Sequence, residues 1–582
     1  MIGLGMDNHH VLNEGTAREI IQGHGDDPRQ LVAALLDIQA ASGRNYVDMK
    51  WASLVSAQMG VPLPRVFDAL TFYPMFSTEP RGRYLIEICR SAPCRFCGTS
   101  DVAGWIESAA GIKIGQTSVD EMITLAYTNC VGACAVGPAV KIGDDVFGDL
   151  NEEKVAALIA RCREGGLEPR PDAPPPGGAD PASVSEYVKA GGFDALRKAA
   201  GMSGEAIVAE LKDAGLLGRQ GEEARPAGEK WERLLRSAET QKHVVCNAGE
   251  GEPGTFKDRL VLDRHPLRLV EGMTIAAFAL GATAGHIHVR GEYRELRKRL
   301  IRAIGNARRA GFLGANILGA RFDFDISVGA GAGAYVCGEE SALLNSVEGK
   351  IGRPGILPAD PAEAGLFQKP TLIDSAESFA DIPAAMGAGG DRLSQTDSPD
   401  SGETKLVCLS GHVRNRGTFE IPLGRLTLRE IIYGDGLGGG IAGGKSLQFF
   451  QIGGQGGPIG SPDLLDTVYG YADLKKAGLS VGSGAIAVMD DTVSVIDYLK
   501  CVIEFFIRES CGKCVPCREG TRHLLDILNR PPGSRNPAGD PDTLRRLIRT
   551  VADASFCGLG RAATVALGSA RERFGPEFGG TS

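Results

Sequence analysis

The sequence predicts a multidomain α/β protein that ends in a helical domain. Its 582 residues are enough for about three to five domains of about 100 to 200 residues each. Strand-like apolar runs alternate with helical patterns over most of the chain, as in βαβ units. Two polar, turn-rich segments, residues 166–182 and 397–403, interrupt these patterned regions and therefore mark domain boundaries.

The first predicted domain spans residues 1–165. Residues 16–72 carry apolar side chains at helical spacing, which predicts a small helical subdomain. Beyond it we expect strands at residues 83–88 and 122–127, a hairpin near residues 143–145 and a helix at residues 152–162. The N-terminal helices are thus followed by a small α/β domain.

Four further segments are predicted in chain order. Residues 166–182 are rich in proline and poor in apolar side chains, which predicts a semi-rigid extended linker. Residues 183–400 alternate strand and helix patterns with glycine-rich turns and predict a second α/β domain. Residues 401–490 contain short strands and Gly-Gly turns, typical of a β-rich module. Residues 491–582 follow a helical pattern and predict a helical domain.

Charge and hydropathy exclude several classes of function. The 63 basic and 72 acidic residues give a formal net charge of -9, so we expect no nucleic-acid binding and no attraction to an anionic membrane surface. No apolar run approaches the length of about 18 residues that a membrane-spanning helix needs, and the first residues do not resemble a signal peptide. We therefore predict a cytoplasmic protein without direct membrane insertion. Because that compartment keeps thiols reduced, the 14 cysteines indicate metal binding before disulfide bonds.

One group of cysteines predicts a [4Fe-4S] cluster. Cys511, Cys514 and Cys517 form a C-x2-C-x2-C pattern, and Cys557 lies further along in a Phe-Cys-Gly-Leu-Gly segment. A cubane needs four converging thiolates, and a loop that supplies three of them, closed by a distant fourth, is typical of such a site. A zinc site and four buried core cysteines stay open as alternatives.

A second group predicts a [2Fe-2S] cluster. Cys89 and Cys94 form a C-x4-C pair after one expected strand, and Cys130 and Cys134 form a C-x3-C pair after the next. Two pairs suit this cluster because each pair can bind one iron. Zinc and inert core thiols are the alternatives, and Cys97 is treated as a non-ligand. The remaining cysteines are expected to be buried core residues: Cys162, Cys246, Cys337, Cys408 and Cys501.

Several stretches resemble a known pair of subunits. Residues 83–137, with both cysteine pairs, resemble the thioredoxin-like 24-kDa subunit of respiratory NADH dehydrogenase. Residues 205–578 resemble the 51-kDa flavin subunit of the same enzyme, and the matching stretches are residues 245–248, 252–259, 331–340 and 509–517. Their fusion in this order is similar to the diaphorase subunits of NAD-reducing hydrogenases and of NAD-dependent formate dehydrogenases.

The resemblance implies a thioredoxin-like ferredoxin domain, a central α/β flavin-type domain, a β-grasp-like module and a C-terminal helical bundle with the cubane. It also implies FMN, NAD(H), and iron-sulfur and catalytic partner subunits of a hydrogenase, a formate dehydrogenase or a related redox complex. In the family, hydride passes from NADH to FMN, because hydride carries two electrons whereas a cluster accepts one. The residues implied for FMN or NAD(H) are Gly218, Arg219, Lys230, Asn247, Glu250, Glu252, Tyr335, Gly338, Glu339, Glu340, Asp374 and Ser375.

The flavin loop departs from the family pattern. The family has G-R-G-G-A-G-F-P-T-G-x-K-W where residues 218–231 read G-R-Q-G-E-E-A-R-P-A-G-E-K-W. Close approach of backbone N–H groups to a phosphate needs glycine, and the carboxylates of Glu222 and Glu223 would repel that phosphate. The loop therefore predicts weakened FMN binding.

Other departures fall in the same pocket. Gly249 replaces an acid, Asp374 and Ser375 replace paired asparagines, and Leu357 and Asp360 replace a lysine and an aromatic of the nucleotide pocket. At about 1 to 3 kcal/mol for each lost interaction, affinity would fall by several orders of magnitude. We therefore expect a degenerate FMN and NAD(H) pocket. The alternative is a flavin held by backbone contacts, residues 338–340 and Lys230.

Two motifs are ambiguous without the resemblance. The small residues 331–334 fit helix–sheet packing better than phosphate binding, and Glu339 and Glu340 fit either a solvated helix start or flavin neighbours. No catalytic residue is assigned.

We predict an iron-sulfur electron-transfer subunit of a soluble multi-subunit oxidoreductase, which passes single electrons to or from a catalytic partner. The alternatives are a working NADH:acceptor diaphorase with FMN, and a structural subunit with inert clusters.

Overall fold

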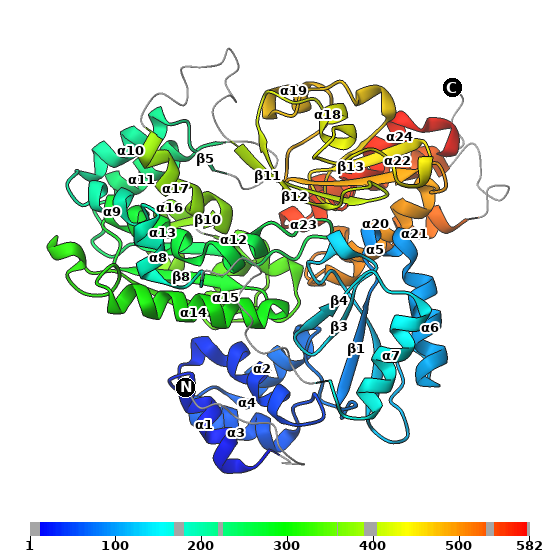
Figure 1. Ribbon diagram of the computed structural model, residues 1–582, viewed down its shortest axis with the longest axis horizontal. Helices are drawn as coiled ribbons and strands as arrows, with labels where there is room; N and C mark the ends of the chain where they lie inside the picture. The colour runs from blue at the N-terminus through cyan, green and yellow to red at the C-terminus, as the bar shows by residue number, and fades with distance from the viewer. Residues whose placement is uncertain are drawn as a thin grey trace.

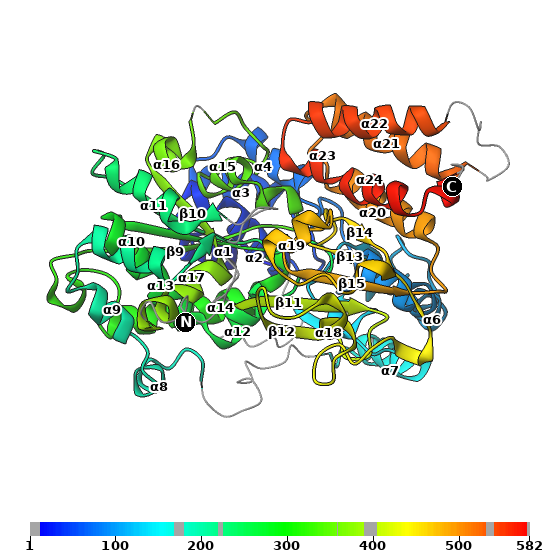
Figure 2. The same ribbon diagram turned by 90° about the horizontal axis from the view of Figure 1, so that it is seen from above.

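The computed structural model describes residues 12–167, 180–218, 225–357, 359–388, 404–530 and 540–578. Most of the predicted linker, the boundary at residues 397–403 and the altered part of the flavin loop lie outside these residues. In Figure 1 the N-terminal helices and the first sheet lie below, the central domain lies to the left, and the last sheet and the C-terminal helices lie at the upper right. Figure 2 shows the C-terminal helices stacked above the sheets when the molecule is turned.

The N-terminal helices form the subdomain predicted for residues 16–72. Side-chain caps begin two of them: Asn13 accepts from the backbone N–H of Thr16, and Asp48 accepts from that of Trp51. Apolar side chains from all four helices pack into one core. The helices are α1 (Glu14–Gly23), α2 (Leu31–Ala41), α3 (Met49–Met59) and α4 (Leu63–Phe72).

The next elements form a mixed four-stranded sheet with the order β2-β1-β3-β4. The central strand β1 pairs parallel with β2 and antiparallel with β3, and helices α6 and α7 pack against the sheet. The predicted strands, hairpin and helix are confirmed, with small shifts at their ends. They are β1 (Tyr84–Cys89), α5 (Ala92–Cys94), α6 (Ser100–Ala110), β2 (Ile123–Thr128), β3 (Val140–Ile142), β4 (Asp145–Phe147) and α7 (Glu152–Arg163).

The central domain is built on a parallel sheet with the order β10-β7-β8-β9. One face packs on α13 (Pro266–Leu280), whereas Val245 and Ile373 on the other face pack on α15 (Glu340–Val347). The strand order reverses at β7, because β8 lies on one side of it and β10 on the other. Ligands of such sheets bind at the carboxyl ends of the strands beside this switch point. The strands are β7 (His243–Ala248), β8 (Ala284–Val289), β9 (Asp325–Ala330) and β10 (Thr371–Ser375).

Helices surround the parallel sheet. The buried Glu271 of α13 anchors the first of them, since it accepts from the Tyr187 hydroxyl at 2.6 Å and from the backbone N–H of Phe193 at 3.0 Å. The helices are α8 (Val184–Lys189), α9 (Asp194–Ala199), α10 (Gly204–Asp213), α11 (Ala227–Arg236), α12 (Asp258–Arg264), α13 (Pro266–Leu280), α14 (Arg294–Arg309), α15 (Glu340–Val347), α16 (Pro361–Ala364) and α17 (Ala376–Ala388). A short pair, β5 (Leu217–Gly218) and β6 (Arg225–Pro226), precedes α11.

The predicted β-rich module is a five-stranded sheet with the order β12-β11-β15-β13-β14. The pair β11 and β15 is parallel, and its neighbours are antiparallel. Its likeness to a β-grasp module stays a prediction. The elements are β11 (Thr404–Gly411), β12 (Gly417–Pro422), α18 (Leu428–Tyr433), β13 (Leu447–Ile452), β14 (Ile459–Gly460), α19 (Tyr471–Lys476) and β15 (Ala485–Asp490).

The chain ends in a helical domain, as predicted. Phe505 and Phe506 of the first helix are fully buried and pack with Leu524, Val551 and Leu567 of later helices. The helices are α20 (Val495–Glu509), α21 (Val515–Asn529), α22 (Asp540–Ala554), α23 (Gly558–Ala562) and α24 (Val565–Arg573). Across the described parts of the chain, no helix has the length and apolar character needed to cross a membrane.

Candidate functional site

Four cysteines of the first α/β domain gather at one end of its sheet. Cys89 ends β1, Cys94 ends α5, and Cys130 and Cys134 lie in the loop after β2; all four are buried. The Sγ atoms of Cys130 and Cys134 are 3.7 Å apart, and Cys94 contacts both Cys89 and Cys134. The Cys134 sulfur and burial raise the pKa of the Cys130 thiol well above its usual value. Four buried thiols that contact one another fit the donor set that a [2Fe-2S] cluster needs.

The loop that carries Cys130 and Cys134 depends on a glycine. Gly132 has a φ of 69°, in the left-handed region that glycine enters without strain. Its backbone N–H also donates to the Cys130 sulfur at 3.4 Å. Such N–H donors stabilise a thiolate and so suit a metal ligand.

The second set of four cysteines lies between helices of the C-terminal domain. Cys511 and Cys514 lie in the turn from α20 to α21, Cys517 lies in the first turn of α21, and Cys557 precedes α23. Cys514 and Cys557 directly precede helices, as the N-cap residues of α21 and α23. Burial raises the pKa of Cys517 to about 11. A hydrogen bond with Ser510 lowers this pKa, whereas the other three sulfurs raise it further. This donor set fits the predicted [4Fe-4S] cluster.

The arrangement of the side chains can also be compared with that of a site for a single metal ion. Within the described ranges, no group of three or more His, Cys, Asp or Glu side chains is arranged to hold one metal ion. A zinc ion lies about 2.3 Å from each of its thiolates, whereas a cluster spreads its thiolates over several iron atoms.

A hydrogen bond joins the two cysteine sites. The side chain of Asn129, next to Cys130, donates to Glu509, two residues before Cys511. Glu509 also accepts from the backbone N–H of Tyr335 at 2.8 Å. Burial raises the pKa of Glu509 to about 7, although both hydrogen bonds act in the opposite direction. The segments beside the two sites are thus in direct contact.

Part of the predicted flavin set converges at the switch point of the parallel sheet. Lys230 donates to the backbone carbonyl of Ile373 at 2.8 Å and lies 3.5 Å from Glu340. Asn247, at the end of β7, donates to the carbonyl of Gly338 at 3.0 Å. Burial and the charge of Glu340 raise the pKa of Asp374 to about 6, against the charge of Lys230. These side chains surround the carboxyl ends of β7 and β10.

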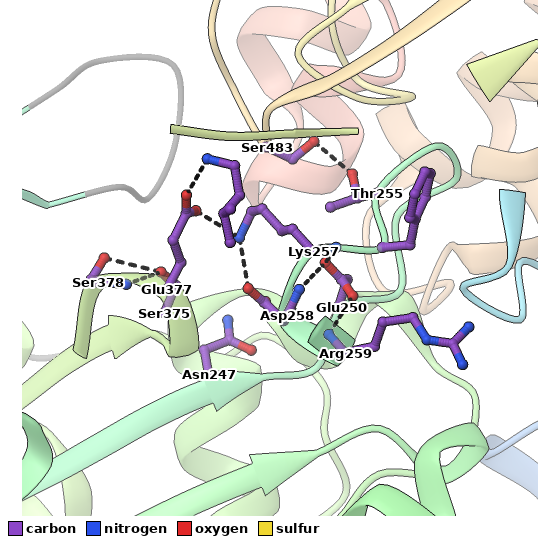
Figure 3. A network of polar contacts seen from close by, with 12 residues as sticks. Asn247, Glu250, Thr255, Lys257, Asp258, Arg259, Ser375, Glu377, Ser378 and Ser483 are labelled. Carbon is purple, nitrogen blue, oxygen red and sulfur yellow. Dashed lines mark hydrogen bonds and ion pairs between the residues drawn. The ribbon is translucent and has the colours of Figure 1, made fainter. Parts of the chain in front are cut away.

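Two of the implied acids are engaged by the protein itself. Figure 3 shows Glu250 at the start of α12, where its carboxylate accepts from the backbone N–H groups of Lys257 and Asp258, both at 2.8 Å. Burial and Asp258 raise the pKa of Glu250 to about 7. Glu252 accepts from the backbone N–H of Gly456 at 3.0 Å and from Tyr335. Both acids therefore connect parts of the chain in this structure.

Two further members act as helix caps. Ser375 accepts from the backbone N–H of Ser378 at 3.1 Å, and Glu339 accepts from that of Ala342 at 3.0 Å. Gly218 lies in β5, whereas Arg219 lies outside the described residues together with Glu222 and Glu223. The structure thus brings together Lys230, Asn247, Gly338, Glu340 and Asp374. The other residues of the predicted set either have local contacts or lie outside the described residues.

The departures from the family pattern have structural counterparts. Asp360 caps α16 and forms an ion pair with Arg233 at 3.0 Å, and Leu357 packs on the apolar cluster beneath α15. A Cβ on Gly249 would lie 3.2 Å from Oδ1 of Asn247, so a side chain there would crowd the crevice. Gly333, with a φ of 84°, would place a Cβ 2.9 Å from Met75, which favours the packing interpretation of residues 331–334.

Sequence reasoning missed three residues that hold the Cys130 loop. Arg290 donates to the backbone carbonyl of Cys130, Arg259 donates to that of Gly132 at 2.6 Å, and Tyr293 lies against Gly132. Arg259 ends one stretch that carries the family resemblance, but nothing in its spacing pairs it with a cysteine more than a hundred positions earlier. The buried location of Arg290, 6% exposed, appears only in the fold.

Comparison with known proteins covers most of the chain. Residues 17–163 match the model of thioredoxin-like [2Fe-2S] ferredoxins, residues 211–384 the Nuo51 FMN-binding domain, and residues 497–580 the NADH-ubiquinone oxidoreductase-F iron-sulfur binding region. Subunit alpha of the NAD-reducing hydrogenase HoxS of Cupriavidus necator is 33% identical over 577 residues, which cover 96% of this chain and 93% of that protein. This chain belongs to the family of NADH dehydrogenase F subunits and hydrogenase diaphorase subunits.

Other members support the same assignment. Subunit HndC of the NADP-reducing hydrogenase of Solidesulfovibrio fructosivorans is 40% identical over 400 residues, which cover 69% of this chain and 80% of that protein. The crystal structure of an NAD+-reducing [NiFe]-hydrogenase in its H2-reduced state aligns with a TM-score of 0.80 at 27% identity and covers 95% of this chain and 92% of the other. Family membership makes the chain an oxidoreductase subunit with [2Fe-2S], FMN-type and [4Fe-4S] domains.

Proposed function

We propose that this family member is an electron-transfer subunit of a multi-subunit oxidoreductase and relays single electrons between its two clusters and a catalytic partner. One observation carries the proposal: the cysteines form two sets of four, and the two sets lie far apart in the sequence. The hydrogen bond between Asn129 and Glu509 then brings the segments beside the two sets together. When bound, each cluster would accept and release one electron at a time.

The chain's own residues would hold the clusters and exclude water. Cys89, Cys94, Cys130 and Cys134 would bind the [2Fe-2S] cluster, and all four are buried. The cubane ligands would be Cys511, Cys514, Cys517 and Cys557, of which only Cys517 is buried. Since solvent access and N–H donors help to set reduction potentials, the two sites would differ in electron affinity.

The state of the FMN and NAD(H) pocket is the finer part of the proposal. We infer that the pocket is degenerate, because the described crevice combines the buried carboxyl group of Asp374 with Glu340 and leaves Lys230 engaged by both Ile373 and Glu340. A phosphate entering this crevice would meet two acids, and the one described cation there already has partners. The rival proposal, a working diaphorase, requires FMN to bind here despite these charges.

Cofactor content tests both parts. Anaerobically purified full-length protein should contain about six iron and about six sulfide atoms per chain, as one [2Fe-2S] and one [4Fe-4S] cluster require. We expect FMN well below one equivalent. Zinc, or no metal, at the cysteine sites would overturn the electron-transfer proposal. Stoichiometric FMN that NADH bleaches would instead establish the diaphorase.

The partner is proposed from the family. HoxS subunit alpha and HndC are subunits of hydrogenases, and we propose a hydrogenase, a formate dehydrogenase or a related redox complex as the setting for this chain. The remaining alternative is a structural subunit with inert clusters. Rapid mixing with the reduced partner separates the two, because a relay requires both clusters to become reduced at the catalytic rate.

A further inference from the structure

The loop proposed to bind the [2Fe-2S] cluster is held by the central domain. Arg290, directly after β8, donates to the backbone carbonyl of Cys130 and to that of Glu250, and forms an ion pair with Glu292 at 2.7 Å. Its side chain is 7% exposed. A buried guanidinium with all these partners keeps one orientation, so the carbonyl of Cys130 is fixed by a residue outside its own domain.

A second arginine holds the same loop. Arg259, in α12, donates from Nη1 to the carbonyl of Gly132 at 2.6 Å. Both guanidinium groups lie near the Tyr293 ring, because the guanidinium carbon of Arg290 is 5.0 Å and that of Arg259 is 5.7 Å from the ring centre. We call Arg259, Arg290 and Tyr293 the arginine clamp.

The loop and the clamp fit closely. A Cβ on Gly132 would lie 2.0 Å from the Tyr293 hydroxyl oxygen, so the loop backbone rests directly on the ring. The same hydroxyl donates to Glu250 at 3.1 Å, and Glu250 accepts from the backbone N–H of Arg259 at 3.3 Å. The clamp is therefore fixed to the start of α12 and does not depend on the N-terminal domain for its position.

The positive charges of Arg259 and Arg290 differ in how far a neighbouring carboxylate offsets them. Arg290 has its ion-pair partner Glu292 at 2.7 Å, so much of its charge is offset locally. Arg259 instead directs its guanidinium at the loop carbonyl and the Tyr293 ring. A reduced cluster carries one more negative charge than an oxidised one, and a cation in a poorly solvated site stabilises the more negative state.

We propose that the arginine clamp positions the Cys130 loop and raises the reduction potential of the [2Fe-2S] cluster, chiefly through the charge of Arg259. The potential of a cluster bound by the N-terminal domain is then set by the central domain. This inference rests on the proposed function, because the cluster at Cys89, Cys94, Cys130 and Cys134 is itself proposed. Arg259 and Arg290 are positioning residues, since both act through the backbone of the ligand loop.

Substitutions at Arg259 separate position from charge. Arg259→Gln keeps a donor for the Gly132 carbonyl and removes the charge, whereas Arg259→Lys keeps the charge and loses the planar fork. Arg259→Met removes both. The matched control is Arg299→Met, because Arg299 is a part-buried arginine of α14 whose ion pair is with Asp263 and not with the loop.

The experiment is a redox titration of the anaerobic full-length protein, followed by low-temperature EPR. Arg259→Gln and Arg259→Met should lower the [2Fe-2S] midpoint potential, so that about tenfold less cluster is reduced at a given potential. A unit charge acting over about 10 Å at an effective dielectric of about 20 has an effect of this order. Arg259→Lys and Arg299→Met should stay near the wild type, and the [4Fe-4S] potential should not change in any variant.

The outcomes distinguish the inference from the proposed function. A wild-type protein without a [2Fe-2S] signal contradicts the proposed function itself. A normal cluster content with an unchanged potential in Arg259→Gln overturns the clamp alone. If Arg259→Met loses the cluster, the other two variants test the inference. A lowered potential in Arg259→Gln together with a retained potential in Arg259→Lys supports it. Equal potentials in these two variants refute it.

Discussion

Lys405, on β11, forms an ion pair with Glu377, on α17, and neither side chain is more than 1% exposed. Lys257 reaches the same carboxylate at 3.0 Å and Asp258 at 2.7 Å (Figure 3). The other oxygen of Glu377 accepts from the backbone N–H of Leu406 at 2.9 Å. This buried network joins the five-stranded sheet to the central domain.

Glu377→Gln should lower the free energy of unfolding by about 3 to 5 kcal/mol, because the buried Lys405 and Lys257 lose the carboxylate that they share, although Lys257 keeps Asp258. Chemical denaturation of the full chain measures this change. Glu363→Gln, at an exposed position of α16, is the control and should have little effect. A loss below about 1 kcal/mol in Glu377→Gln would show that the network does not stabilise the domain contact.

Asp374→Asn should tighten FMN binding about tenfold, because it removes a carboxylate from the crevice. The unfavourable contribution of such a group to binding is about 1 to 3 kcal/mol. The pKa of Asp374 is raised to about 6, so its charged form dominates at pH 7. FMN binding by the wild type should therefore strengthen as the pH falls from about 7 to about 5, whereas binding by the variant should respond less. Flavin fluorescence titration measures both; equal pH dependence in the two proteins would contradict the role of Asp374.

Asp37 should contribute stability that acid removes. Burial opposes its ionisation, but His24, Arg294 and Arg297 outweigh burial and lower its pKa from 3.8 to about 2. Because the folded pKa is the lower one, the contribution is complete above the unfolded value of 3.8 and is lost as the pH falls toward 2. We expect Asp37→Asn to cost about 2 kcal/mol at pH 7 and to flatten this part of the stability curve. Thermal unfolding between pH 2 and pH 7 checks the prediction, and parallel curves for the two proteins would refute it.

Cys514→Ala should abolish the [4Fe-4S] EPR signal and spare the [2Fe-2S] signal, because no apolar cluster of the described residues contains cysteines of both sets. Cys162→Ala, at a buried cysteine of α7, should spare both signals. Loss of both signals in Cys514→Ala would mean that the contact between Asn129 and Glu509 makes one site depend on the other.

The sequence predicted many of the helices and strands well, because these depend on local spacing, whereas the assignment of the cysteine sets to clusters stays a prediction. Period-two and helical patterns located strands such as β1 and helices such as α7, and the two cysteine pairs fall at the ends of β1 and β2 as expected. The sequence did not predict which distant segments of the chain come together in the fold. Glu250 and Glu252 were implied as flavin residues, yet their carboxylates meet donors from α12 and from Gly456.

The same limit explains the arginine clamp. A basic residue in a sequence carries no sign of whether it meets water, a carboxylate or a backbone carbonyl. Arg259 and Arg290 reach the backbone carbonyls of Gly132 and Cys130 only when the first α/β domain docks on the central domain.

The first α/β domain meets the rest of the molecule through apolar contacts, such as that of Phe96 with Tyr498, and through several polar contacts. The polar contacts include Arg95 with Glu504 at 2.8 Å, Arg259 with Gly132 and Asn129 with Glu509. Because both sides belong to one polypeptide, each segment meets the other at an effective concentration in the millimolar range. Tethering therefore allows weak, reversible bonds to maintain an alignment that two separate chains would have to secure by affinity, and a competing protein would have to overcome that local excess.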